Sequence, residues 1–144
     1  MIAGRSDYVG AKLLLVHDRH VLAYLRDDKP GLPWAGLWDL PGGGREGDET
    51  PEACVLRELA EEFGLTFPPA RLLWSRAFRS LGDAARLGWF FAGRIDASDI
   101  AKVRFGDEGQ HWRMMPLADW LSHPDAAAPL QDRSRIALTD LGWL

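Results

Sequence analysis

Three glutamates crowd a short stretch of the chain. Glu58, Glu61 and Glu62 fall within five positions, so the residues three and four places after Glu58 are again acidic. On a helix such residues are neighbours, and like charges there destabilise each other by about 0.2–0.5 kcal/mol per pair. That cost is too small to exclude an ordinary solvated acidic face. Clustered carboxylate oxygens are also the ligands that Mg²⁺ prefers, so the spacing equally permits a metal site.

The residues before this cluster favour the metal interpretation. A glycine-rich stretch, Gly42-Gly43-Gly44, follows Pro41 and leads into the acidic segment. Glycine lets the backbone approach a ligand closely, because it carries no side chain. Carboxylates beside exposed carbonyls and a phosphate would surround a divalent cation with oxygen. Between positions 50 and 65, Arg57 is the only cation. A metal ion would therefore convert the repulsion among the glutamates into shared coordination.

A helix from Thr50 to Phe63 is predicted to position these groups. Thr50 suits the N-cap, Pro51 suits the first helical position, and Gly64 suits a left-handed C-terminal cap. At about 100° per residue, apolar residues gather on one side of this helix. The members of this stripe are Ala53, Leu56, Ala60 and Phe63, with Leu59 at its border. We expect the stripe to pack on a sheet and the glutamates to lie on the opposite side.

The remaining sequence predicts strands interleaved with helices. Apolar, β-branched or aromatic runs predict strands at 8–16, 21–25, 37–40, 72–78, 87–95 and 110–115. Further helices are predicted at 116–122 and at 129–141, the latter with Leu130, Ile136 and Leu141 inward. The chain of 144 residues is close to the usual size of one domain and has no internal repeat. We therefore expect a single α/β domain over residues 1–144, with helices packed on a mixed sheet.

Composition limits the partners and the location. The formal net charge of −4 argues against a protein that wraps nucleic acid, but a bound metal would still allow a small phosphate-bearing ligand. No apolar run approaches the roughly 20 residues that span a bilayer. Asp7 and Lys12 interrupt the N-terminal stretch where a signal peptide would lie, and Cys54 is the only cysteine. We expect a cytoplasmic protein with no nucleic-acid or membrane partner.

The acidic segment and its glycine lead-in resemble the signature of the Nudix hydrolases. That signature is a glycine, five residues, a glutamate, seven residues, and then Arg-Glu-apolar-x-Glu-Glu-x-Gly-apolar. Here Gly43 is followed by GREGD, Glu49, TPEACVL and RELAEEFGL, which fills every fixed position. The preceding LWDLPGG also resembles the usual lead-in. The resemblance implies an α/β/α sandwich that hydrolyses a nucleoside diphosphate linked to another group, with Mg²⁺ or Mn²⁺ as cofactor.

The resemblance also implies roles for the residues of the signature. Glu58, Glu61 and Glu62 correspond to the metal-binding carboxylates, and the carbonyl of Gly43 to a further ligand. Arg57 corresponds to the residue that orients the glutamates through charge-assisted hydrogen bonds. The loop glutamate, Glu49, corresponds to a structural or electrostatic partner, with Arg57 as the candidate pair.

The general base is not fixed by the signature. Glu58 and Glu61 are candidates on the helix. The segment GDEGQ resembles a glutamate-glycine-glutamine segment late in MutT-like members, which makes Glu108 a third candidate base and a further metal ligand. In those proteins this glutamate reaches the metal site from a loop opposite the helix. An ordinary acidic turn is the alternative for Glu108, so the base stays unassigned.

Candidate substrate contacts are less specific. Arg26 resembles a phosphate-contacting arginine of MutT-like proteins, with a surface charge as the alternative. Arg45, in the glycine loop, could also meet phosphate, and the backbone of Leu40 could bind the edge of a base. Tryptophans could stack on a base, with core packing as the alternative for each. The tryptophans considered are Trp34, Trp38 and Trp112.

Missing features narrow the substrate class. No tyrosine follows the signature, unlike in dinucleoside polyphosphate hydrolases, and residues 77–83 lack the proline typical of ADP-ribose hydrolases. The chain thus resembles most the MutT-like enzymes, which convert nucleoside triphosphates such as 8-oxo-dGTP to a monophosphate and pyrophosphate. Hydrolysis of ADP-ribose, a nucleotide sugar or a dinucleoside polyphosphate stays an alternative, as does a non-catalytic nucleotide-sensing module. The partner is expected to be a small nucleotide, and the protein a monomer or homodimer.

Overall fold

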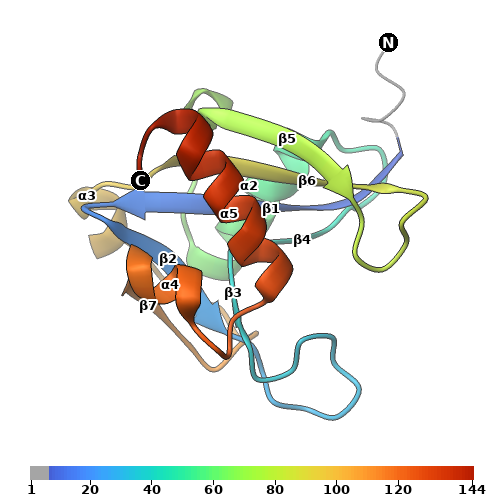
Figure 1. The fold of residues 1–144 in the computed structure, drawn as a ribbon, viewed down its shortest axis with the longest axis horizontal. Helices are drawn as coiled ribbons and strands as arrows, with labels where there is room; N and C mark the ends of the chain where they lie inside the picture. Colours follow the sequence, from blue (N-terminus) through green and yellow to red (C-terminus); the bar gives the residue numbers. More distant parts are fainter. Residues whose placement is uncertain (1–6) are drawn as a thin grey trace.

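The computed structural model describes residues 7–144 (Figure 1). Residues 1–6, part of the N-terminal stretch considered for a signal peptide, lie outside this range. The elements are β1 (Tyr8–His17), β2 (His20–Leu25), β3 (Trp38–Asp39), β4 (Gly42–Gly44), α2 (Pro51–Phe63), the 3₁₀ turn η1 (Pro69–Arg71), β5 (Trp74–Arg79), β6 (Leu87–Arg94), α3 (Ala97–Ala101), β7 (His111–Pro116), α4 (Leu117–Ser122) and α5 (Ala128–Leu141). Within the described range, no helix combines the length and apolar character needed to cross a bilayer.

The strands form one mixed sheet around β1. The main strand order is β3-β2-β1-β6-β5, with β4 also paired to β1 and β7 to β2. Strands β1 and β6 run parallel, and the remaining pairs between these strands are antiparallel. The predicted β1–β2 hairpin is present, with positive φ angles of 46° and 58° at Asp18 and Arg19. Two such residues are typical of the tight turns that match the twist of a hairpin.

Helices cover both faces of the sheet. Side chains along β1 alternate between the faces, as strand geometry requires. Leu13 and Leu15 pack with α2, whereas Leu14 and Val16 pack with α4 and α5. In Figure 1 helix α5 crosses in front of the sheet and α2 lies behind it. The α/β sandwich with a mixed sheet is therefore confirmed.

Local caps fix the ends of α2 at the predicted residues. The Thr50 hydroxyl accepts a hydrogen bond from the backbone N–H of Ala53 at 3.1 Å, and Pro51 opens the helix. Gly64 adopts the left-handed conformation, with φ of 68°, and its N–H donates to the carbonyl of Ala60 at 3.0 Å. Both caps satisfy backbone groups that the ends of a helix leave unpaired.

The predicted facing of α2 was wrong in part: Phe63 and the border residue Leu59 are buried as expected, but the other members of the stripe are not. Ala53 and Ala60, assigned to the buried stripe, are exposed, and Leu56 is half-buried. The buried residues of the helix are Pro51, Cys54, Val55, Leu59 and Phe63. Alanine is compatible with a buried or an exposed face. Including Ala53 and Ala60 therefore rotated the predicted buried face by roughly a third of a turn from the observed one. The corrected face runs from Cys54 to Phe63 and includes the arc that carries Glu58 and Glu62. Those two glutamates therefore border the core rather than oppose it.

Besides the turn η1, two short elements were not predicted. Strand β4 consists only of glycines, which are depleted in strands, so no side-chain pattern marks it. It pairs with β1 in the register Gly10–Gly44, Ala11–Gly43 and Lys12–Gly42. Helix α3, of five residues, is too short for a periodic pattern, although Asp96 and Asp99 form a capping box at its start.

The terminal helix differs in detail from its prediction. Helix α5 buries Leu130, as expected, but Ile136 and Leu141 are only partly buried. Ala137 and Leu138, both 0% exposed, supply the rest of its apolar contact with the sheet.

Replacing Leu59 with alanine should test the corrected face of α2. Leu59 is 0% exposed and belongs to the cluster between α2 and the sheet. We expect Leu59→Ala to lower the free energy of unfolding by about 2–5 kcal/mol, because it leaves a cavity. Urea unfolding of the variant and of Ala60→Ser, an exposed neighbour, measures this. An Ala60→Ser loss as large as that of Leu59→Ala would contradict the corrected facing.

Candidate active site

Arg57 lies at the centre of the charged cluster on α2. Its Nε and Nη2 atoms donate to the two carboxylate oxygens of Glu49, at 3.0 and 2.8 Å. Its Nη1 donates to Glu58 at 2.9 Å and to Glu61 at 3.1 Å, and Nη2 also donates to the carbonyl of Gly44 at 2.9 Å. The hydrogen bonds to Glu49, followed by those to Glu58 and Glu61, raise the pKa of Arg57 despite its partial burial. The planar guanidinium thus ties the loop, β4 and the helix together.

A group of carboxylates with metal-ligand spacing surrounds this arginine. One oxygen each from Glu46, Glu58 and Glu61 lies within 4.8 Å of the other two. Glu46 was not predicted, because it falls in the five-residue spacer of the signature, where no residue type is specified. Its carboxylate also pairs with Arg57 at 3.0 Å. The loop between β4 and α2 therefore supplies a carboxylate, that of Glu46, in addition to those of the helix.

Glu62 lies deeper than the other glutamates. Its Oε1 accepts a hydrogen bond from the backbone N–H of Gly42 at 2.9 Å. Burial raises the pKa of Glu62 to about 8, and the negative charges of Glu58 and Asp39 add to this effect. Burial also raises the pKa of Glu58, against the opposing effect of Arg57. Carboxylates that share a low-dielectric site are stabilised as anions by a cation, so the donor set fits a divalent metal ion.

The loop after α3 closes the opposite side of the acidic pocket. The backbone N–H of Gly106 donates to the carbonyl of Glu62 at 2.9 Å, which docks this loop on the end of α2. A pocket of about 370 Å³ lies between them. The residues that line it are Glu46, Glu58, Glu61, Glu62, Gly106, Asp107 and Glu108. Glu108 therefore lines the same pocket as the helix glutamates.

Arg26 lies between two further pockets. Its Nη1 donates to the buried carboxylate of Asp39 at 3.0 Å, and its Nε donates to the carbonyl of Pro33 at 2.9 Å. One pocket, of about 290 Å³, contains Arg26, Lys29 and also Glu108 of the acidic pocket. The other, of about 320 Å³, contains Arg26 and Trp34. Arg26 therefore lines both pockets, and the first of them shares Glu108 with the acidic pocket.

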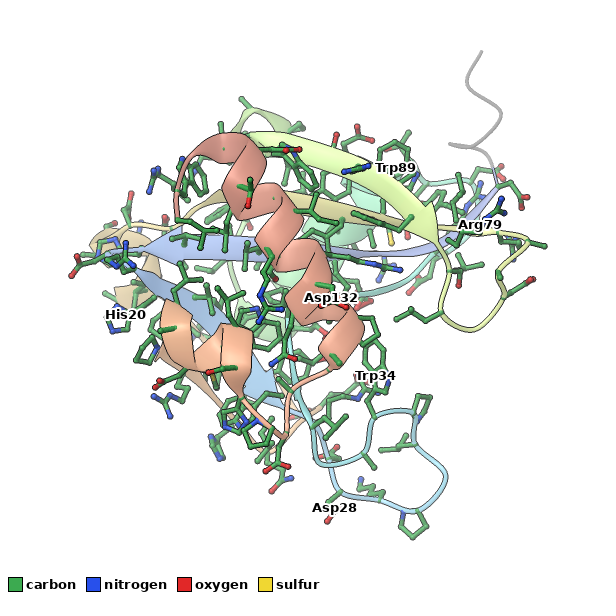
Figure 2. The ribbon with its side chains drawn as sticks, in the orientation of Figure 1. His20, Asp28, Trp34, Arg79, Trp89 and Asp132 are labelled. Carbon is green, nitrogen blue, oxygen red and sulfur yellow. The ribbon has the colours of Figure 1, made fainter. Side chains whose placement is uncertain are left out.

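Trp34 lines two adjoining pockets. It is half-buried, and Figure 2 shows it turned from its loop toward the start of α5, whereas Asp28 points outward from the same loop. Besides the pocket with Arg26, it lines an adjoining pocket of about 220 Å³ that reaches Leu130 of α5. Leu81, half exposed on the β5–β6 loop, lines both of these pockets.

The other predicted substrate contacts lie elsewhere. Trp38 is 8% exposed and packs in the core, with its ring 5.3 Å from that of His111. Leu40 is fully buried; its N–H donates to Asp39 at 2.7 Å, and its carbonyl accepts from Lys12 at 3.4 Å. Arg45 sits over the ring of Tyr8 at 4.7 Å and donates to Gly47, outside the acidic pocket. Trp112 is partly buried beside α2. The residue types alone did not distinguish a side chain that packs in the core from one that contacts a ligand.

Comparison with known proteins gives the same family as the signature. The NUDIX domain family matches residues 8–137. An RNA pyrophosphohydrolase of Acidiphilium cryptum (strain JF-5) is 45% identical over 158 residues, covering 92% of this chain and 92% of that protein. An 8-oxo-dGTP diphosphatase of Proteus vulgaris is 36% identical over 59 residues, covering 41% of this chain and 53% of that protein. In fold, the chain is similar to the MutT protein of Methanosarcina mazei Go1, with TM-score 0.71, 24% identity and coverage of 94% and 96%.

The mixed sheet, the capped acidic helix and these matches define the class of protein. The chain belongs to the NUDIX family of hydrolases, as the resemblance predicted. Some matches are partial: the chain spans 53% of the diphosphatase and only 35% of a further RNA pyrophosphohydrolase, from Gluconacetobacter diazotrophicus. The activities named for those relatives therefore show kinship without assigning a substrate to this chain.

Replacing Glu49 should destabilise the protein in a pH-dependent way. Hydrogen bonds from Arg57 lower the pKa of Glu49 from 4.5 to about 2. Because the folded-state pKa is depressed, this stabilisation is present above pH 4.5 and is lost as the pH falls toward 2. We expect Glu49→Gln to lower the free energy of unfolding by about 1–3 kcal/mol at neutral pH. The difference from the unsubstituted protein should shrink in acid.

Urea unfolding at a series of pH values measures this difference. Asp48→Asn is the matched control, because Asp48 is an exposed carboxylate in the same loop. A Glu49→Gln effect of constant size from neutral pH down to the acid limb would contradict the assigned role of the Arg57 pair.

Proposed function

We propose that the protein is a nucleotide pyrophosphohydrolase that depends on a divalent cation, Mg²⁺ or Mn²⁺. The observation that carries this proposal is the convergence of acidic groups on one pocket, three from α2 and the others from two loops. Phosphate oxygens and carboxylates repel each other, so such a pocket suits a polyphosphate only when a cation lies between them. Family membership supports the same reaction class.

In this proposal some residues bind the cation and Arg57 orients them. We assign Glu58, Glu61, Glu62 and the Gly43 carbonyl to the cation, and Glu46, whose oxygen lies within 4.8 Å of those of Glu58 and Glu61, would add a loop carboxylate. A divalent cation supplies neutralisation of the phosphate charge and polarisation of the phosphorus centre. Arg57 holds Glu58 and Glu61 in place, which limits the reorganisation needed during the reaction.

The attacking group is water. A carboxylate accepts a proton from the water while the water oxygen bonds to phosphorus. The phosphoanhydride bond then breaks and releases pyrophosphate. Glu58, Glu61 and Glu108 are the candidates for this base, because all three line the acidic pocket.

The substrate we favour is a nucleoside triphosphate such as 8-oxo-dGTP. The polyphosphate would lie in the acidic pocket, with Arg26 beside it and the base near Trp34. Similarity to an 8-oxo-dGTP diphosphatase supports this class. A second candidate is the 5′-triphosphate end of RNA, which offers the same phosphoanhydride bond. The relative matched over 92% of both chains is named an RNA pyrophosphohydrolase, which supports this second candidate.

A substrate panel separates these candidates. Purified protein with Mg²⁺ would be given dGTP, 8-oxo-dGTP, a 5′-triphosphorylated oligoribonucleotide, ADP-ribose, a nucleotide sugar and a dinucleoside tetraphosphate. Pyrophosphate released from dGTP or 8-oxo-dGTP supports the nucleoside triphosphate, and pyrophosphate released from the oligoribonucleotide supports the RNA candidate. Phosphate or AMP from the other substrates supports the alternatives. Tight binding without turnover under Mg²⁺ and Mn²⁺ would indicate a nucleotide-sensing module and overturn the proposal.

Glu61→Gln should remove activity without removing the fold. The Glu61 side chain is 56% exposed, so we expect the free energy of unfolding to change by no more than about 0.5 kcal/mol. We expect kcat to fall by about 10²-fold or more, because a charged oxygen ligand and candidate base is lost. Steady-state kinetics on the best substrate of the panel measures this. Glu52→Gln, on the first turn of the same helix, should keep its activity; comparable losses in both variants would contradict the site.

A further inference from the structure

Asp39 is a fully buried carboxylate at the end of β3, shortly before the glycine strand β4. Its Oδ2 accepts hydrogen bonds from Lys12 at 2.9 Å, Arg26 at 3.0 Å and the hydroxyl of Tyr24 at 3.2 Å. Its Oδ1 accepts from the backbone N–H of Leu40 at 2.7 Å. A buried charge persists only when it is paired and hydrogen-bonded in this way. Asp39 therefore fixes two cations, from β1 and from the end of β2, at the start of the segment that leads to β4.

Lys12 contacts three oxygens of this segment, the carboxylate of Asp39 at short range and two backbone carbonyls at longer range. Besides Asp39, its Nζ donates to the carbonyl of Leu40 at 3.4 Å and to the carbonyl of Gly42 at 3.5 Å. An ammonium group has three N–H donors, and here three protein oxygens accept them. The side chain of Lys12 is only 18% exposed. Lys12 also lines the pocket that contains Arg26 and Trp34, but its ammonium group is already paired with Asp39, so it is suited to holding backbone.

The backbone that Lys12 holds contacts the acidic pocket. Gly42 N–H donates to Glu62, which sets the orientation of that carboxylate. The next residue, Gly43, packs so tightly on Glu58 that an added Cβ would lie 2.3 Å from its Oε2. A shift of the Gly42–Gly43 backbone would therefore move both glutamates and the Gly43 carbonyl. These are the groups assigned above to the divalent cation.

We propose that Lys12 is a positioning residue for the divalent-cation site. Its ammonium group, anchored on Asp39, holds the carbonyls of Leu40 and Gly42 and so keeps Glu58, Glu62 and Gly43 in a geometry that binds the cation. This inference rests on the proposed function, because it assumes that the acidic pocket binds a metal ion. It goes beyond that function by placing a determinant of metal affinity on β1, outside the acidic pocket.

Metal binding by Lys12→Met, without substrate, tests the proposal. Methionine keeps the length and apolar stem of lysine but cannot donate a hydrogen bond. The free Mn²⁺ signal in electron paramagnetic resonance gives the Kd for Mn²⁺ directly. We expect the Kd to rise about tenfold or more, the usual effect of removing a group that orients metal ligands. Lys102→Met, an exposed lysine at the end of α3, is the matched control and should bind Mn²⁺ as the unsubstituted protein does.

The outcomes separate the two levels of inference. If the unsubstituted protein bound no Mn²⁺, and Glu58→Gln changed nothing, both the proposed function and this inference would fail. If the unsubstituted protein bound Mn²⁺ and Lys12→Met bound it equally well, the inference alone would fail. A raised KM for nucleotide with unchanged Mn²⁺ affinity would also overturn it, because Lys12 would then contact the substrate.

A second variant guards against loss of the fold. Circular dichroism and urea unfolding establish whether Lys12→Met is folded. Lys12→Gln keeps a donor group at this position without the charge and with a shorter reach, so we expect a Mn²⁺ Kd between those of lysine and methionine. A folded Lys12→Gln protein with unchanged Mn²⁺ affinity would overturn the proposal by itself.

Discussion

The site depends on how closely strand β4 packs against β1 on one side and against helix α2 on the other. An added Cβ at Gly42 would lie 2.1 Å from the carbonyl oxygen of Ala11, and one at Gly10 would lie 2.6 Å from that of Gly43. On the other side, Gly43 abuts the carboxylate of Glu58. Only glycine allows a strand to fit between β1 and α2 at these separations. The close packing that pairs β4 with β1 also brings backbone carbonyls of β4 next to carboxylates of α2.

Close packing of carboxylates there requires compensation, and two cations provide it from opposite sides. Arg57 pairs with Glu49, Glu58 and Glu61 at the solvent side of the helix. Lys12 reaches the glycine segment from β1, and its charge lowers the pKa of Glu62 against the larger effect of burial. Neither cation neutralises all the carboxylates of the pocket. A net negative charge therefore remains at the pocket, which suits the divalent cation of the proposed function.

The sequence predicted what local chemistry determines. Thr50, Pro51 and Gly64 set the ends of α2, and strong apolar runs gave the main strands within a few residues. It did not predict the face of α2, because Ala53 and Ala60 are compatible with core or solvent and only the fit against β1 and β4 decides. Nor did it identify Lys12, since a lysine in a strand gives no sign of the distant backbone it contacts. Glu46 was missed for a similar reason: its approach to Glu58 depends on the turn of the loop.

Cys54 shows how the same packing affects reactivity. Its thiol lies at 0% exposure under β4, 3.6 Å from the carbonyl oxygens of Gly43 and Gly44. Burial, with the negative charge of Glu49, raises its pKa to about 12. Since the thiolate is the reactive form, this sulfur is protected from alkylating reagents and oxidants while the protein is folded. A cysteine introduced on an exposed loop would therefore offer a single attachment point for a spectroscopic label, with no need to remove the native thiol.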